Sequence, residues 1–115
     1  MDSIKAQKGS ADIKGKALDL PALVEYQDGA VVSREIVREK TGTVTAFAFD
    51  QGQQLSEHTA PFDALVIGLD GAADISISGQ AHAVKQGEMI IMPAGIPHAL
   101  RAVSRFKMLL VMIKK

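Results

Sequence analysis

Gly87-Glu-Met-Ile-Ile-Met-Pro-Ala-Gly-Ile-Pro-His98 is the stretch of this chain that decides its fold. The apolar run at 89–92 suits a buried strand, and Pro93 ends that strand because proline has no backbone N–H to donate to a neighbour. Gly95 then allows a sharp turn, and His98 begins the next strand. The sequence therefore predicts two strands joined by a tight turn, with a histidine at the rim of a barrel.

A second stretch has a similar arrangement of glycines, a histidine and apolar residues. It runs Gly52-Gln-Gln-Leu-Ser-Glu-His58-Thr-Ala-Pro-Phe-Asp-Ala64, and a further glycine follows at Gly71. Together the two stretches resemble the signature motifs of the cupin family, G-x5-H-x-H-x3,4-E-x6-G and G-x5-P-x-G-x2-H. The resemblance covers roughly residues 52–102. It implies an all-β fold, the double-stranded β-helix (jelly-roll) cupin barrel, in a small single-domain protein of the cupin 2 type.

The first motif keeps its glycines but loses most of the metal ligands that the family carries there. Ala60 stands at the second histidine position, and the glutamate position holds Ala64, or Leu65 with the longer spacer. Of the ligands that the resemblance implies, His58 and His98 remain. We therefore expect an incomplete metal site.

Length and composition fit one globular domain. The chain has 115 residues and is 47% hydrophobic and 23% charged, so it is long enough to bury a core and too apolar to be disordered. Residues 17–115 are predicted to form the barrel. Residues 1–16 are polar and show no hydrophobic period, which predicts a flexible lead-in.

Charge and cysteine content narrow the expected partners and location. Lys plus Arg and Asp plus Glu both count 13, which disfavours binding to nucleic acid or to an anionic membrane. There is no cysteine, so disulfides and thiolate chemistry are excluded. No stretch approaches the roughly 20 apolar residues of a membrane span, and the first fifteen residues lack the apolar core of a signal peptide. We expect a cytoplasmic protein.

Short apolar segments separated by turn signals predict strands along the rest of the chain. A hairpin is expected with strands at 23–26 and 30–37, joined at Asp28-Gly29. The strand over 44–49 should place its two phenylalanines on one face and its alanines on the other. Further strands are predicted at 65–69, 73–77, 81–85, 89–92 and 106–113.

Two of these strands are apolar on both faces, so each needs a cover on both sides. In a barrel the inner faces fill the interior, while the outer faces must meet another sheet or another chain. Two alternatives follow, a homodimer contact or a cover by the N-terminal hairpin within one chain, and a homodimer is our expectation. The outer-face candidates are Leu65, Ile67, Leu69, Leu109, Val111 and Ile113.

Alternation along a strand limits which side chains can join His58 as metal ligands. A transition metal needs three or four converging protein ligands, and Glu57 points to the opposite face from His58. Asp63 could face the interior only if the preceding Pro-Phe pair introduced a bulge. A divalent metal (Fe, Mn, Ni or Zn) is therefore possible but would rest on an incomplete set, His58 and His98.

Soft apolar side chains could line the mouth of such a barrel and favour an apolar or aromatic ligand. Which of them face inward depends on a strand register that the sequence does not fix. The candidates are Phe62, Met89, Met92, Phe106, Met108 and Met112.

Two main functions are compatible with these residues. The first, which we favour, is a small-molecule-binding barrel that does not convert its ligand, with His58, His98, Ser56, Gln54 and Phe62 as ligand-binding residues. The second is a metal-dependent enzyme, such as an oxygenase, isomerase or decarboxylase acting on a small carboxylated or phenolic substrate, and fold analogy alone supports it. A cavity too small for several waters would instead favour a plugged interior without a ligand.

Overall fold

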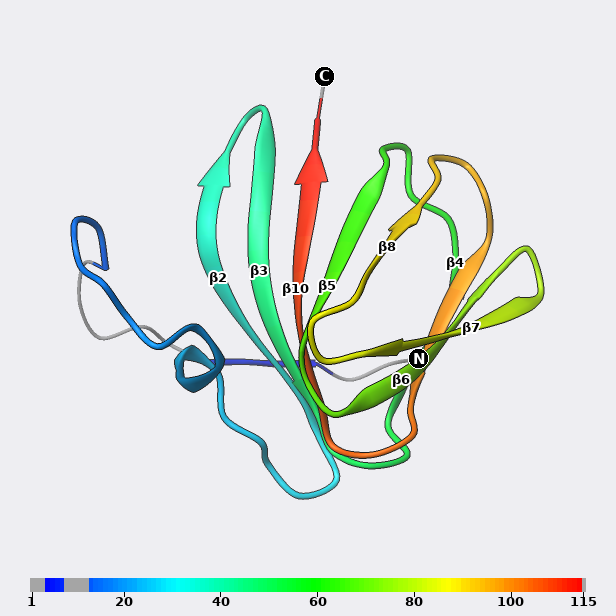
Figure 1. Cartoon of the computed structure of the whole chain (residues 1–115). Helices are drawn as coiled ribbons and strands as arrows, with labels where there is room; N and C mark the ends of the chain where they lie inside the picture. The colour runs from blue at the N-terminus through cyan, green and yellow to red at the C-terminus, as the bar shows by residue number, and fades with distance from the viewer. Residues whose placement is uncertain (1–3, 8–12, 115) are drawn as a thin grey trace.

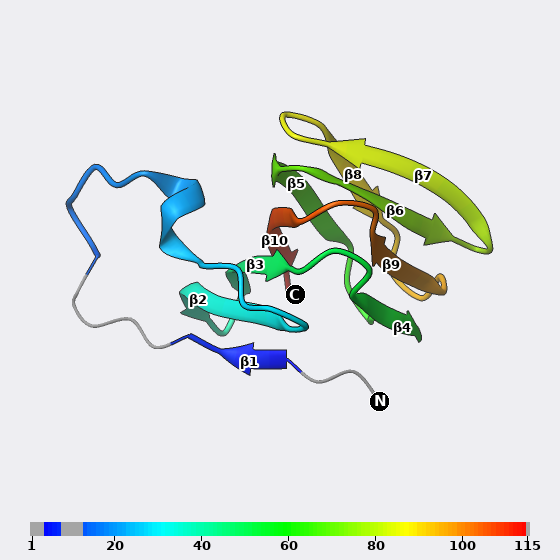
Figure 2. The ribbon, with the colours of Figure 1, turned by 90° about the horizontal axis from the view of Figure 1, so that it is seen from below.

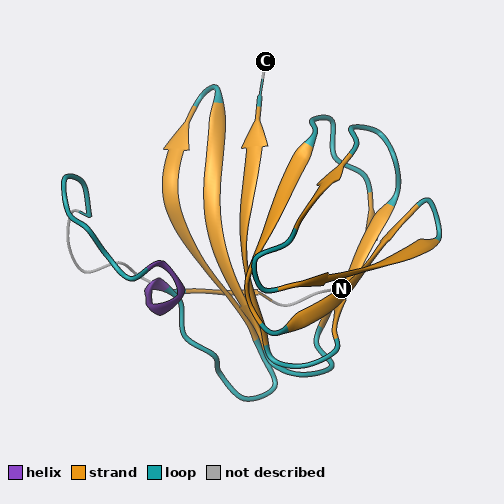
Figure 3. Ribbon diagram, viewed as in Figure 1, coloured by secondary structure: helices purple, strands orange, loops and turns teal. Residues whose placement is uncertain are grey.

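The computed structural model describes residues 4–7 and 13–114, and nearly all of its regular structure is β-strand (Figures 1 and 3). One short 3₁₀ helix, η1, spans Leu20–Leu23. The strands are β1 (Ile4–Ala6), β2 (Val31–Glu39), β3 (Gly42–Phe49), β4 (Gln54–His58), β5 (Ala64–Asp70), β6 (Ala72–Ile77), β7 (Gln80–Lys85), β8 (Met89–Met92), β9 (His98–Ala102) and β10 (Phe106–Ile113).

The strands form two sheets that pack face to face, which Figure 2 shows from below. One sheet has the strand order β1-β2-β3-β10-β5-β8 and the other β4-β9-β6-β7. The pair β1 and β2 is parallel, and the other pairs are antiparallel. The chain passes from one sheet to the other and back, so the predicted all-β jelly roll is confirmed.

The core lies between the two sheets and is aromatic on the side of β3 and β10. The rings of Phe47 and Phe49 lie 5.9 Å apart between centroids, and those of Phe49 and Phe106 lie 6.0 Å apart. The expectation that the two phenylalanines of β3 share a face is confirmed, because both belong to this core cluster. Alternate residues of β5, β6 and β9 complete it, including Val66, Ala73, Ile75, Leu100 and Ala102.

The predicted N-terminal hairpin is wrong in its first strand. The turn at Gly29 is present, with a φ of 66°, and β2 follows it, but residues 23–26 form the end of η1 and an irregular segment. Leu23 and Glu25 bond to side chains instead of to a partner strand. Arg34 (3.1 Å) and Gln7 (3.0 Å) donate to the Leu23 carbonyl, and the Glu25 N–H donates to the side-chain oxygen of Gln7 (3.0 Å). Apolar side chains of this segment, such as Val24, are buried against the sheet, but its backbone does not pair with a strand. We call residues 20–28 the N-terminal cover.

This N-terminal cover packs on the outer face of the six-stranded sheet. Val24 is fully buried in a second apolar cluster with Val32 of β2 and Ala46 and Ala48 of β3, and Leu109 packs against that cluster. Part of the apolar outer face is therefore covered within one chain. This is one of the two alternatives that the sequence leaves open for Leu109.

Polar contacts fix the cover to the end of the barrel where β10 begins. The Tyr26 hydroxyl donates to Asp70 (2.6 Å), and the Lys107 ammonium lies 4.9 Å from the centre of the Tyr26 ring. Arg105 donates to Asp28 (2.6 Å) and to Asp50 (2.9 Å). Burial, followed by the hydrogen bond to Asp70, raises the pKa of Tyr26 above its ordinary value.

Beyond the cover, an apolar row crosses five strands of the same outer face. Strand register places its members side by side from β2 to β8, and they are Val37, Val44, Val111, Leu65 and Ile91. Val37 is 48% exposed and Ile91 51% exposed. The row is therefore open at its two ends, on β2 and on β8.

Within the predicted lead-in of residues 1–16, three residues form β1, which pairs with the start of β2. The sequence pattern does not predict this strand; the free edge of β2 supplies its hydrogen-bonding partners. Residues 1–3 and 8–12, and Lys115 at the other end of the predicted barrel domain, lie outside the described residues. In the part of the chain that the structure describes, no helix is long and apolar enough to cross a membrane.

Candidate ligand-binding site

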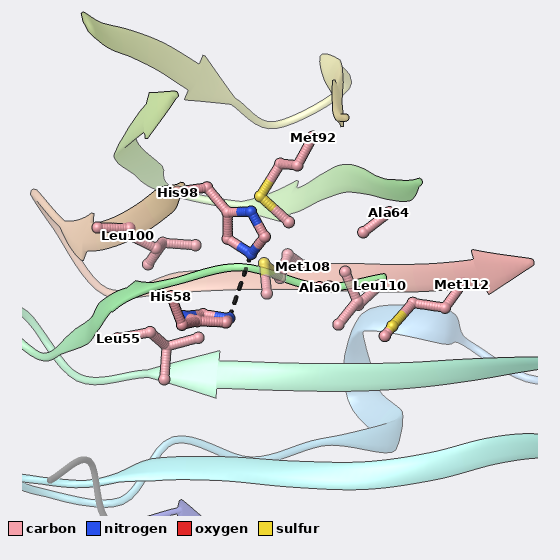
Figure 4. Close-up of a pocket in the computed structure, with 11 residues that line it drawn as sticks. Leu55, His58, Ala60, Ala64, Met92, His98, Leu100, Met108, Leu110 and Met112 are labelled. Atoms are coloured by element: carbon pink, nitrogen blue, oxygen red, sulfur yellow. Dashed lines mark hydrogen bonds between the residues drawn. The ribbon is translucent and has the colours of Figure 1, made fainter. Parts of the chain in front are cut away.

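Two neighbouring strands of the four-stranded sheet bring His58 and His98 together. His58 ends β4 and His98 begins β9, and the two residues are register partners. Their Nε2 atoms lie 3.2 Å apart, and the ring centroids lie 4.4 Å apart with the rings nearly perpendicular (Figure 4). His98 is 4% exposed, whereas His58 is exposed at the mouth. The sequence-based pairing of these imidazoles is therefore present in the fold.

A β-bulge in β4 is what turns His58 inward. His58 lies three positions after Leu55 on β4, whereas their partners on β9, Leu100 and His98, are two positions apart. The extra residue resets the alternation of side chains, so Leu55 and His58 both face the interior. The sequence places Ser56 on the same strand face as His58, and the bulge makes that placement wrong.

Ser56 and Gln54 line a different surface from the histidines. They border a groove of about 370 Å³ on the outer face of the four-stranded sheet, together with Asp74, Ser76 and Arg101. Neither residue belongs to the lining of the interior hollow. Their predicted role as ligand-binding residues beside His58 therefore does not match this geometry.

Hydrogen bonds assign the protons of the two imidazoles. The backbone carbonyl of Ser56 lies 2.7 Å from His58 Nδ1, and a carbonyl can only accept, so Nδ1 carries the proton. His58 Nε2 of the neutral ring is then an acceptor, and His98 Nε2–H donates to it. This leaves His98 Nδ1 as a bare acceptor, and it is buried without a hydrogen-bond partner.

The surroundings of His98 favour its neutral form. Burial, and next the charge that His58 carries when protonated, hold the pKa of His98 below its ordinary value. The backbone of Ile96 acts to raise the pKa of His98, but it does not form a hydrogen bond with Nδ1. A neutral imidazole that lacks a hydrogen-bond partner at one nitrogen is poised to accept a donor or a cation.

The two histidines border a hollow of about 70 Å³ between the sheets, which Figure 4 shows. A single water needs roughly 10–15 Å³ on this measure, so the hollow holds several. Small side chains at Ala60 and Ala64 leave the space open. The lining residues are Leu55, His58, Ala60, Ala64, Met92, His98, Ala99, Leu100, Met108, Leu110 and Met112.

None of the described residues brings a carboxylate to the histidines in the hollow. Asp63 is exposed and accepts a hydrogen bond from the Ala94 backbone N–H (2.8 Å), so the bulge that would bring it inward does not form there. Phe62 lies in the loop between β4 and β5 and does not line the hollow. Among the described residues, no group of three His, Cys, Asp or Glu side chains comes close enough to hold a metal.

Strand register decides which of the candidate methionines face the hollow. Met112, Ala64 and Met92 are successive partners across β10, β5 and β8 and share one face. Met108 lies four residues before Met112 on β10, so its side chain is on that same face. Met89 points outward and is 56% exposed. Alternation along one strand could not have selected these methionines, because their facing depends on how β5 pairs with β8 and with β10.

Comparison with known proteins agrees with this architecture. A family model described as "Cupin domain" matches residues 46–114. A conserved protein of unknown function from Streptococcus pyogenes is 42% identical, with a TM-score of 0.84, over 88% of this chain and 89% of that one. A cupin superfamily protein from Desulfitobacterium hafniense is 26% identical, with a TM-score of 0.84, over 89% of this chain and 94% of that one.

A longer relative contains a domain of the same kind. The cupin 2 conserved barrel domain protein from Leptotrichia buccalis is 41% identical with a TM-score of 0.82, over 84% of this chain and 47% of that one. Among curated proteins, none matches the chain significantly.

Proposed function

This chain belongs to the cupin family, and we propose that the hollow of its barrel binds a small, mostly apolar organic molecule without converting it. The composition of the hollow carries this proposal. Nine of its eleven lining residues are apolar, and the other two are the paired histidines. An apolar wall with a few convergent polar groups is the usual make-up of a small-molecule site.

The polar end of the site sets which ligands fit. His58 lies at the mouth, and His98 lies behind it with the buried nitrogen that has no partner. A ligand would place its apolar body against the methionines and leucines and one polar group, such as a carboxylate or a phenol hydroxyl, on the imidazoles. The size of the hollow favours a molecule of few heavy atoms, or one end of a larger molecule.

Thermal unfolding in the presence of small aromatic probes tests this proposal. Benzoate and phenol are the probes, each titrated to millimolar concentration against chelator-treated protein. At ten times the Kd a ligand adds about 1.4 kcal/mol to the stability, which for a domain of this size raises the Tm by about 5 °C. We expect a dose-dependent rise with at least one of the probes.

Two variants and one control locate the binding. Ala60→Leu fills the mouth of the hollow and should abolish the rise, and His98→Gln should reduce it. Gln54→Ala lies on the outer groove and should leave the rise unchanged. A rise that survives Ala60→Leu, or the absence of any rise with both probes, would exclude this hollow as the site.

A divalent metal centre for an oxygenase, isomerase or decarboxylase reaction does not fit the side chains in the hollow. The lining residues offer two imidazoles and no carboxylate or thiolate. Fe, Mn, Ni and Zn sites use three or four protein ligands drawn from imidazole, carboxylate and thiolate groups. Asp63 is held by a backbone contact of its own. We therefore assign no catalytic step to such a metal.

We also propose that two copies pair through the open apolar row on the six-stranded sheet. The row contains no charged side chain, so it can lie against its own copy around a two-fold axis without opposing like charges. It spans five strands, about 20 Å across at the spacing of a sheet. Its exposed members, Val37 and Ile91, would be buried in the contact.

Sedimentation equilibrium at micromolar concentration tests the pairing. The wild type should have twice the mass of the chain, and Ile91→Glu should have the mass of one chain because it places a charge in the row. Arg101→Glu, on the outer face of the opposite sheet, is the matched control and should still pair. A wild type that stays monomeric at 100 μM, or an Ile91→Glu variant that pairs normally, would refute it.

A further inference from the structure

We propose that the groove on the outer face of the four-stranded sheet binds a basic α-amino acid, lysine or arginine, through its carboxylate, its α-ammonium group and its side-chain cation. This goes beyond the proposed function, because the groove and the hollow lie on opposite faces of that sheet and share no polar lining residue. The groove measures about 370 Å³, which lies within the range of roughly 300–1,000 Å³ for small-molecule sites.

Small residues form the floor of the groove, and longer polar side chains stand beside it. Strands β4, β9 and β6 lie side by side in this sheet (Figure 2). Ala99 of β9 and Ser76 of β6 are register partners, and so are Arg101 and Asp74, two residues further along the same strands. Side chains two residues apart share a face of a sheet. The long pair therefore borders a low floor, which leaves room for a ligand.

Arg101 and Asp74 carry opposite charges at directly opposed positions, yet they do not pair with each other. In the part of the chain that the structure describes, neither group has an ion-pair or hydrogen-bond partner. Register partners have Cβ atoms about 4.5–5.5 Å apart, so one molecule above them can contact both. A guanidinium binds a carboxylate through two parallel N–H donors. An α-amino acid, whose carboxylate and ammonium group share one carbon atom, matches this pair.

The bulge in β4 adds a second acidic group to the groove. Leu55 and His58 both face the interior, so the two residues between them, Ser56 and Glu57, line the groove. The lining then carries two carboxylates and one guanidinium. A neutral amino acid would leave Glu57 without a cation, whereas lysine or arginine supplies one. Charge complementarity therefore favours a basic amino acid over a neutral or an acidic one.

The same lining disfavours other kinds of small molecule. It contains no aromatic ring, so the aromatic probes proposed for the hollow would have nothing to stack on here. A simple anion would meet two carboxylates, and a simple cation would leave Arg101 without a partner. The open apolar row lies on the other sheet, so pairing of two copies through that row leaves the groove accessible.

Chemical-shift titration of the isotope-labelled full chain tests this site, with L-lysine, L-arginine and two analogues of lysine. Norleucine lacks the side-chain ammonium group, and cadaverine lacks the carboxylate. Because exposed ion pairs are individually weak, we expect a Kd of about 1–10 mM for lysine or arginine and binding at least about threefold weaker for each analogue. The amide shifts should centre on residues 54–57, 74–76 and 99–101.

Variants assign the contacts one at a time. Arg101→Gln and Asp74→Asn should each weaken lysine binding at least about threefold, and Glu57→Gln should remove the preference for lysine over norleucine. Arg38→Gln and Glu39→Gln make matched charge changes on β2, outside the groove, and should bind lysine like the wild type. Their amide spectra away from the substituted residue should also stay like that of the wild type.

Three results would overturn the amino-acid site. They are the absence of saturable shifts with either basic amino acid at ten times the highest expected Kd, equal binding of cadaverine and lysine, and unchanged lysine affinity in Arg101→Gln. The hollow is tested separately, because Arg101→Gln should keep the rise in Tm that benzoate or phenol produces. The two proposals can therefore fail independently.

Discussion

The two ends of the barrel interior differ in how completely side chains fill them. At the end where β10 begins, Phe49 and Phe106 are fully buried with their rings in contact. At the other end of β10, alanines face methionines and a histidine pair, and a hollow remains. We therefore expect the packing of the first end to contribute more to the free energy of unfolding than the packing of the second end.

The backbone is also more closely packed at the filled end than at the open end. At the filled end, the turn after β5 passes so close to the turn before β10 that Gly71 has no space for a side chain. At the open end, β4 contains a bulge and His58 is exposed. A site for ligands is expected where strands end and the packing is incomplete, because binding needs space that a native core does not leave. Substitutions can test each half of this comparison.

The largest effect should come from Phe106→Ala at the filled end. Removing a fully buried phenylalanine leaves a cavity and costs about 3–5 kcal/mol. Met112→Ala at the open end, where the side chain is half-buried and borders a space already present, should cost less than about 2 kcal/mol. Urea unfolding measures both free energies. Equal losses in the two variants would mean that the ends are packed alike.

A smaller loss is expected from Gly71→Ala in the turn between β5 and β6. Its φ is 70°, and an added Cβ would overlap the backbone carbonyl of Arg105, so the two turns must move apart; we expect a loss of roughly 2–4 kcal/mol. Gly79→Ala is the control, because its φ is 80° but nothing lies within 4 Å of the new atom. It should lose only about 1 kcal/mol. Thermal and urea unfolding should rank the two variants in that order.

Tyr26→Phe should show a still smaller effect, on the outside of the filled end. It removes the hydroxyl that donates to Asp70 while keeping the ring under Lys107. A half-buried hydrogen bond to a carboxylate is worth about 1 kcal/mol. Urea unfolding should detect this loss, and Tyr26→Leu, which also removes the ring, should lose more. If the two variants matched the wild type, the N-terminal cover would not stabilise this end.

The filled end was also the easier half to predict from the sequence. Alternation in 44–49 places Phe47 and Phe49 on one face correctly, because side-chain direction along a regular strand needs only parity. Phe106 was a candidate for the mouth, and the structure instead buries it in the core at the filled end. The glycines of both motifs mark turns for the same local reason. The prediction of the first hairpin failed because Leu23 and Glu25 form hydrogen bonds with the side chains of Gln7 and Arg34, which are distant in the sequence and which no local pattern reveals.

The candidate site was predictable only in part. The motif positions of His58 and His98 indicated a pair, but the bulge between Leu55 and His58 reset the alternation and moved Ser56 and Gln54 to the outer groove. A bulge is an extra residue between paired strands, so it exists only relative to its partner. The role of Met108 depends in the same way on the pairing of β10.

The smallest expected effect concerns the histidine pair at the open end and the pH dependence of stability. Burial, and then His58, hold the pKa of His98 below its ordinary value of 6.5. The unfolded chain therefore takes up a proton near pH 6.5 that the folded chain resists. The stabilisation is complete above that pH and is lost as the pH falls through 6.5 toward the lower pKa of the folded state.

Urea unfolding of chelator-treated protein between pH 7.5 and 5 should therefore give a falling free energy of unfolding for the wild type. His98→Gln cannot titrate and should flatten that fall, whereas His82→Gln, whose histidine lies on β7 away from the hollow, should keep it. The depressed pKa of Asp50, set first by the Gly29 backbone N–H and then by Arg105, acts only below its ordinary value of 3.8 and so leaves this window clear. Equal slopes for the wild type and His98→Gln would mean that the open end is wet enough to solvate a charged imidazole, and the contrast between the two ends would then be one of packing alone.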